Sequence, residues 1–152
     1  GIYSATKYLL ANDFEKNLDK TVKNLIEFWD LVGEQFEKWT AVRTGKIAAS
    51  EIRRDYINTH VVALQAIGLT GKVLIEKFPT TWKSKLKNLN KIDWLKNNKI
   101  WQGRVIVNGR VMKSHATITL MANVIKTALG VKLTPEEQTI ETNLKKALKN
   151  VG

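Results

Sequence analysis

Several features are missing from this 152-residue chain, and each absence excludes a class of protein. Cysteine is absent, which rules out disulfides, zinc–cysteine sites and thiol chemistry, and which fits a reducing compartment such as the cytoplasm. No apolar run approaches the ~18 residues of a membrane-spanning helix and no signal peptide opens the chain, so we expect a soluble cytoplasmic protein without a membrane partner.

The sequence motifs of common enzymes are missing as well. There is no glycine-rich phosphate loop, no histidine pair at metal-ligand spacing and no serine–histidine–aspartate set. Ser114 and His115 are adjacent, but neighbouring residues on a helix do not face each other, so they make a poor nucleophile and base. We therefore expect no enzymatic activity and no bound metal or cofactor.

Acidic residues are scarce in the middle third of the chain, and this scarcity sets the net charge of +11. Residues 77–132 contain twelve lysines and arginines against one acid, Asp93, whereas segments 1–76 and 133–152 are each neutral overall. Such an asymmetry predicts a polyanionic partner, either nucleic acid or an acidic lipid surface. A lysine-rich proteome would add lysines, but it would not remove acids from one window.

Helical periodicity covers most of the chain. Apolar spacing predicts about seven helices, over residues 4–10, 15–38, 51–68 with a continuation at 69–78, 82–89, 114–129 and from 134 onward. The predicted fold class is all-α, an irregular multi-helix bundle with one short β-hairpin or loop near residues 104–112. The length suits one domain, so we treat 1–152 as a single helical domain, and its start within an apparent helix suggests a C-terminal fragment of a longer protein.

The aromatic residues admit two interpretations. Trp29, Tyr56, Trp82 and Trp94 fall on the apolar sides of their helices, which predicts that they are largely buried. Tryptophans interleaved with lysines can instead stack on the bases of a single strand, and we favour burial over such a platform. His60 shares the apolar stripe of Tyr56 and is predicted to be a hydrogen-bonded core residue.

The stretch 101–130 organises the basic segment. Asn108-Gly109 is a strong tight-turn signal, because both residues tolerate positive φ, and short apolar runs flank it. Ser114 then predicts the N-cap of a long apolar helix, and Gly130 predicts its end. Exposed amides at that helix start would join the cations Arg104, Arg110 and Lys113 in an anion-binding surface.

From charge and local geometry we predict DNA contacts at nine residues, which are Lys83, Lys85, Lys87, Lys96, Lys99, Arg104, Arg110, Lys113 and Ser114. Two alternatives stay open. These residues can be ordinary solvated charges around a hairpin. Arg104 or Arg110 can also serve as a structural residue in a buried ion pair with Asp55 or Glu51.

Three segments carry a resemblance to a known family. They are E-I-R-R-D-Y-I-N-T-H-V-V-A-L-Q-A-I-G (51–68), I-D-W-L-K-N-N-K-I-W-Q-G-R (92–104) and G-R-V-M-K-S-H-A-T-I-T-L-M-A-N-V-I-K-T-A-L-G-V-K-L-T-P-E-E (109–137). Their order and spacing resemble the C-terminal part of the DndB family, the DNA sulfur modification proteins of the DGQHR-domain group. The D-G-Q-H-R motif itself is not in this sequence, which fits a C-terminal fragment.

The resemblance implies a bacterial protein of a DNA phosphorothioation system, in which DndB is a DNA-binding transcriptional regulator of the modification genes. Double-stranded DNA is then the expected partner, together with other DNA modification proteins, and the oligomeric state stays open, a homodimer included. The alternative is a protein-interaction domain that docks on modification or restriction components. A nuclease or modification subunit is disfavoured, because the chain has no acidic metal cluster.

Overall fold

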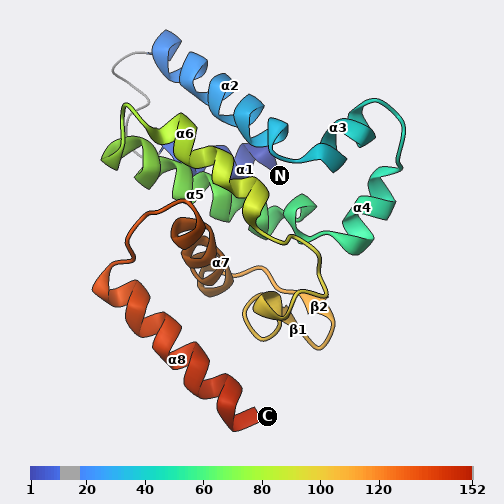
Figure 1. Ribbon diagram of the computed structural model, residues 1–152, viewed down its shortest axis with the longest axis vertical. Coiled ribbons are helices and arrows are strands. Elements are labelled where there is room, and N and C mark those ends of the chain that lie inside the picture. Colours follow the sequence, from blue (N-terminus) through green and yellow to red (C-terminus); the bar gives the residue numbers. More distant parts are fainter. Residues whose placement is uncertain (11–17, 152) are drawn as a thin grey trace.

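The computed structural model describes residues 1–10 and 18–151 (Figure 1). This part of the chain contains eight α-helices, three short 3₁₀ helices and one two-stranded antiparallel hairpin, which confirms the all-α class. The elements are α1 (Ile2–Leu10), α2 (Leu18–Glu34), α3 (Glu37–Arg43), α4 (Ala49–Asp55), η1 (Ile57–Thr59), α5 (Val61–Lys77), α6 (Trp82–Leu86), η2 (Lys87–Lys91), η3 (Lys99–Trp101), β1 (Ile106–Val107), β2 (Arg110–Val111), α7 (His115–Ala128) and α8 (Pro135–Val151). The predicted start of the second helix near residue 15 lies outside the described residues.

Helix α5 is the centre of the fold. Ten of its residues are buried, on all sides of the helix, and α1 and α7 both pack against it. At Gly68 the backbone of α1 comes so close that a Cβ would lie 2.3 Å from the carbonyl oxygen of Ala5. Glycine is therefore required at this crossing, and the predicted helix up to residue 68 and its continuation at 69–78 form one helix, α5, that runs through Gly68 to Lys77.

The predicted helix 51–68 is wrong in one respect, because it is broken between Asp55 and Val61. Tyr56 is extended, with φ −116° and ψ 136°, and forms an isolated antiparallel β-bridge with Leu95. The Ile57 amide donates to the Trp94 carbonyl and the Lys96 amide donates to the Asp55 carbonyl, both at 2.9 Å. The segment around Trp94 thus takes backbone hydrogen bonds that a continuous helix would have made with itself.

Aromatic rings connect the core to the periphery. Trp82 and Trp94 are buried as predicted, with 7% and 5% of their surface exposed, whereas Trp29 and Tyr56 are only half-buried. Phe36 contacts Trp39 at a ring-centroid distance of 4.7 Å and Trp94 at 5.3 Å, and Trp94 stacks on the fully buried Trp101 at 5.7 Å. This row of rings ties the segment that precedes the hairpin to α3.

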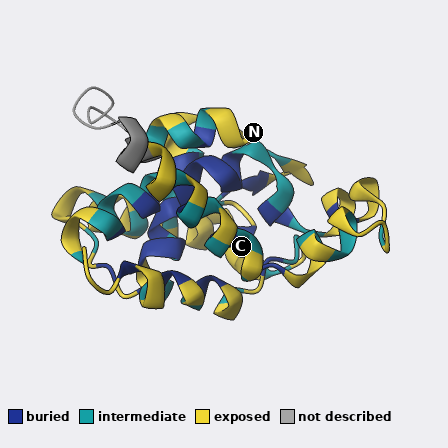
Figure 2. Ribbon diagram, turned by 90° about the horizontal axis from the view of Figure 1, so that it is seen from above, coloured by how far each residue is buried: buried dark blue, intermediate teal, exposed yellow. Residues whose placement is uncertain are grey.

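Helices α3 and α4 form an arm that extends from the body. Both views place this arm at the right of the molecule, and most of its residues are exposed or half-buried (Figures 1 and 2). Helix α3 buries no residue, and Ile52 is the buried residue of α4. The N-cap of α4 is Ala48, and Ser50 lies inside the helix.

Candidate nucleic-acid interface

The hairpin forms where the sequence predicts it. Val107 pairs with Arg110 and Ile106 with Val111, and the connecting residues Asn108 and Gly109 have φ of 50° and 74°. Ile106 is buried, whereas Arg110 is exposed at the tip. The buried strand residue anchors the hairpin to the core and leaves the arginine in solvent, in reach of a large ligand.

Helix α7 begins beside the hairpin with a complete N-terminal cap. The Ser114 hydroxyl accepts from the Thr117 amide at 3.1 Å, and the Thr117 hydroxyl accepts from the Ser114 amide at 2.8 Å. Ser114 is therefore the predicted N-cap, and Gly130, with φ 78°, follows the other end. Lys113, Ser114 and His115 are exposed. A cation and the positive end of a helix dipole thus lie together on the surface, an arrangement that favours anions.

Arg104 is not available at this surface, so the structure corrects its predicted role. Its guanidinium makes two hydrogen bonds to the Glu141 carboxylate, of 2.6 and 2.8 Å, and others to the carbonyls of Leu120 and Ile100. Only 10% of the side chain is exposed. The alternative that Arg104 forms a buried ion pair is therefore confirmed, but its partner is Glu141 of α8 and not Asp55 or Glu51.

A second cation of the basic segment is neutralised in the same way. The Lys126 ammonium lies 3.0 Å from both carboxylate oxygens of Glu137, and the lysine side chain is 8% exposed. Burial raises the pKa of Glu141, but hydrogen bonds from Arg104 and Asn123 outweigh it, and the pKa lies below its ordinary value. The acids at the start and middle of α8 therefore cover two of the twelve cations of residues 77–132.

The predicted lysines of α6 and η2 lie apart from the hairpin. Figure 1 places α6 and the hairpin in different parts of the molecule. Lys83 forms an ion pair of 3.1 Å with Glu27, and the half-buried Lys85 covers the Phe78 ring at 4.3 Å. Lys87 is exposed. The structure therefore does not bring the nine predicted residues into one patch.

Lys96 and Lys99 lie in the loop between these two groups. Lys99 is exposed in η3, and Lys96 is half-buried beside the end of α4. Burial and the charge of Arg53 lower the pKa of Lys96. The sequence did not group Lys96 with Arg53, because their proximity depends on the β-bridge between Tyr56 and Leu95, and a single isolated bridge leaves no pattern in the sequence.

Arg110 and Lys113 are both exposed, and both lie in the short segment that runs from the hairpin tip to the capped start of α7. A family model described as DndB, DNA-sulfur modification-associated, matches residues 1–132, and the chain belongs to this family. No curated protein and no solved structure gives a significant match.

Within residues 1–10 and 18–151, no group of three or more histidine, aspartate or glutamate side chains is placed to hold a metal ion. No helix of the same residues has the length and apolar character needed to span a bilayer.

Proposed function

We propose that this chain is a duplex-DNA-binding regulatory domain of a DNA phosphorothioation system, in which it controls transcription of the modification genes. The family places the chain in DNA sulfur modification. The observation that carries the proposal is that Arg110, at the hairpin tip, and Lys113, next to the N-cap Ser114 of α7, are both exposed. A narrow hairpin can enter a groove while the helix amides and the lysine contact the flanking phosphates.

The test is a salt titration of duplex binding by the parent and by Arg110→Ala and Lys113→Ala. Each phosphate contact contributes about 0.9 to the slope of log K against log salt, so each variant should bind more weakly on all sequences and lose about one unit of slope. Lys149→Ala, exposed near the end of α8, is the matched control because it removes the same charge elsewhere. An unchanged slope in both hairpin variants would contradict the proposal.

A second candidate function rests on a different observation. Val107, Met112 and Ile100 are large apolar side chains near the hairpin, and each is more than 40% exposed. Such residues favour a protein-interaction surface that docks on other modification or restriction components. If this function is the correct one, Val107→Ser and Met112→Ser will abolish association with the partner, while Arg110→Ala will leave it intact.

A further inference from the structure

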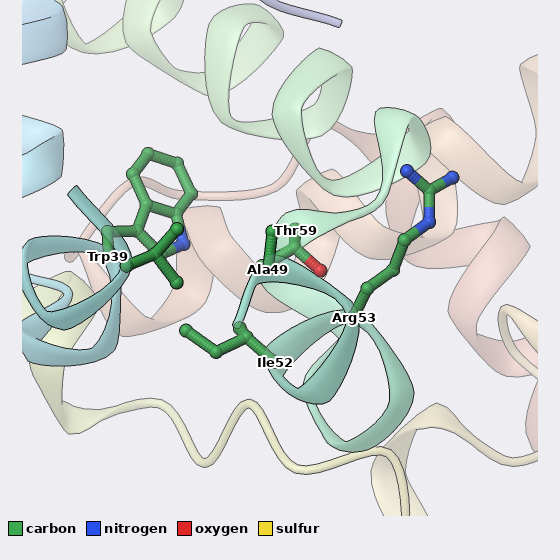
Figure 3. Close-up of a pocket in the computed structure, with 6 residues that line it drawn as sticks. Trp39, Ala49, Ile52, Arg53 and Thr59 are labelled. Atoms are coloured by element: carbon green, nitrogen blue, oxygen red, sulfur yellow. The ribbon is translucent and has the colours of Figure 1, made fainter. Parts of the chain in front are cut away.

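The arm of α3 and α4 contains a pocket that the proposed DNA-binding hairpin does not use. The pocket has a volume of about 280 Å³ and lies between the two helices (Figure 3). Its lining residues are Trp39, Val42, Ala49, Ile52, Arg53 and Thr59. Aliphatic side chains and an indole ring form most of the wall, whereas the guanidinium of Arg53 extends away from Trp39 and Ile52 (Figure 3). This volume is near the lower end of ligand pockets, which run from about 300 to 1,000 Å³, and it suits a single ring system.

The indole of Trp39 has an unused hydrogen-bond donor. Its Nε1 is buried without a hydrogen-bond partner, and Figure 3 shows this nitrogen turned toward Ile52 and Thr59. A buried donor without a partner costs about 1–3 kcal/mol, so an acceptor from a ligand would be stabilising here. Phe36 packs against Trp39 at 4.7 Å and holds the indole in place.

Backbone contacts bring three cationic or ionisable residues near one another. Arg53 lies in the last turn of α4, His60 precedes α5, and Lys96 follows the β-bridge that joins their segments. The His60 ring lies 3.1 Å from the Arg53 carbonyl through Nε2. Because a carbonyl can only accept, Nε2 carries the proton and donates, and Nδ1 remains for another partner.

Among the described residues, no carboxylate oxygen lies within 4.0 Å of the charged groups of Arg53, His60 or Lys96. Asp55 acts on Lys96 from further away, and Arg54 binds both of its carboxylate oxygens, at 2.8 and 3.1 Å. Burial and the charges of Lys96 and Arg53 lower the pKa of His60, against the opposing effect of its backbone hydrogen bond. Burial and Arg53 likewise lower the pKa of Lys96, although Asp55 acts in the opposite direction. Mutual repulsion of this kind is relieved when an anion binds.

We propose that this pocket and cluster bind one nucleotide unit, with the base against Trp39 and the phosphate at Arg53, His60 and Lys96. A flat heteroaromatic ring fits the apolar wall and offers acceptors to the indole donor, and stacking of a base on an aromatic side chain contributes about 1–3 kcal/mol. The nucleotide unit that occupies the pocket can have two sources, which are a free nucleotide and an unpaired nucleotide of a DNA strand. The proposal goes beyond duplex binding at the hairpin and does not depend on it.

The experiment titrates the full chain with adenosine monophosphate and follows the ring signals of Trp39 and His60 by NMR. Adenosine and inorganic phosphate are the half-ligand probes, and each should bind at least tenfold more weakly than the nucleotide. Arg53→Ala should weaken nucleotide binding about tenfold, as expected for loss of a charged hydrogen bond. Arg54→Ala is the matched control, because it lies on the same helix and is already paired with Asp55.

A second variant keeps the test valid if replacement of Trp39 disturbs the fold. Ala49 is exposed in the first turn of α4 and lines the pocket, so Ala49→Trp should fill the pocket and abolish binding while the thermal unfolding midpoint is retained. Equal losses in Arg53→Ala and Arg54→Ala, or equal affinity for phosphate and nucleotide, would overturn the proposal.

A matched duplex and one with a single bulged adenine separate the two sources. Tighter binding of the bulge identifies DNA, and tighter binding of the free nucleotide identifies a small ligand. If only Arg110→Ala loses binding to the matched duplex, that loss belongs to the hairpin and does not count against the nucleotide site.

Discussion

Arg104 and Lys126 show how little the count of charges says about a single residue. Both belong to the basic segment, yet each is bound to a carboxylate of α8 and largely buried. Arg104 also donates to the carbonyls of Leu120 and Ile100, so its side chain connects α7, α8 and η3, which precedes the hairpin. At this scale the contact partners, and not the sign of the charge, decide whether a cation can meet a ligand.

The first residue-scale prediction concerns Glu141. Glu141→Gln should lower the free energy of unfolding by about 2–3 kcal/mol, because it leaves the charge of Arg104 without its partner. The figure is below the ~3–5 kcal/mol of a fully buried pair, since 17% of the Glu141 side chain is exposed. Chemical denaturation measures the change, and Glu136→Gln, exposed in the first turn of α8, is the control.

The pH dependence of the same pair has a defined sign. The pKa of Glu141 is below its ordinary value of 4.5, so the unfolded chain takes up the proton first as the pH falls. The stabilising contribution of the Glu141 carboxylate is complete above about pH 4.5 and is lost as the pH falls through the folded-state pKa of Glu141. Acid titration of the parent should therefore show a loss of stability that Glu141→Gln lacks. Identical acid profiles would show that the pair contributes nothing.

His60 gives a second residue-scale prediction, in a different pH range. Its pKa is lowered, first by burial and then by Lys96 and Arg53, so the folded protein favours the neutral ring. Above the ordinary pKa of 6.5 both states are neutral, and below it the unfolded chain binds a proton that the folded protein resists. Stability should decline as the pH falls from 6.5 toward the folded-state pKa. Thermal unfolding of His60→Gln should lack this decline, and His115→Asn, at the exposed start of α7, is the control variant.

At the scale of elements, close backbone contact decides how α1 and α5 pack. Gly68→Ala places a methyl group 2.3 Å from the carbonyl oxygen of Ala5, so α1 must move. Overpacking of this kind costs about 1–3 kcal/mol, which exceeds the ~1 kcal/mol that alanine gains over glycine inside a helix. Denaturant unfolding should therefore show a net loss of stability.

Gly33 provides the matched control for this substitution. It also lies in a helix, near the end of α2, but nothing approaches the position of its Cβ within 4 Å. Gly33→Ala should consequently stabilise the protein by about 0.4–1 kcal/mol. If both alanines stabilise, the α1–α5 contact is looser than the structure shows.

The elements also show what the sequence could predict. Local signals predicted the Asn108-Gly109 turn, the Ser114 cap and the end of α7 before Gly130, because each depends on the residues next to it. The break at Tyr56 and the partner of Arg104 could not be predicted. The first depends on a bridge to Leu95 and the second on a helix 37 residues away, and neither contact has a local pattern. For the candidate site, the sequence therefore identified the basic segment but not which of its cations are free.

At the scale of the whole molecule, the positive charge is divided between separate regions. The hairpin and the start of α7 form one group, and α6 with η2 forms another in a different part of the fold (Figure 1). Residues 1–132, which match the family, include both groups, whereas α8 with its two pairing acids lies beyond the match. A polyanion that binds at the hairpin is therefore expected to leave the α6 group free.

The last prediction tests this division by comparing variants from the two groups. Lys83→Ala and Lys85→Ala should leave the salt slope of duplex binding unchanged, because Lys83 is paired with Glu27 and Lys85 covers Phe78. Lys113→Ala should lower the slope by about 0.9, the value for one lost phosphate contact. All three substitutions remove one positive charge, so a general dependence on net charge would change the three slopes alike. A local interface changes only the third. Equal effects would mean that the +11 charge attracts DNA without a defined binding surface.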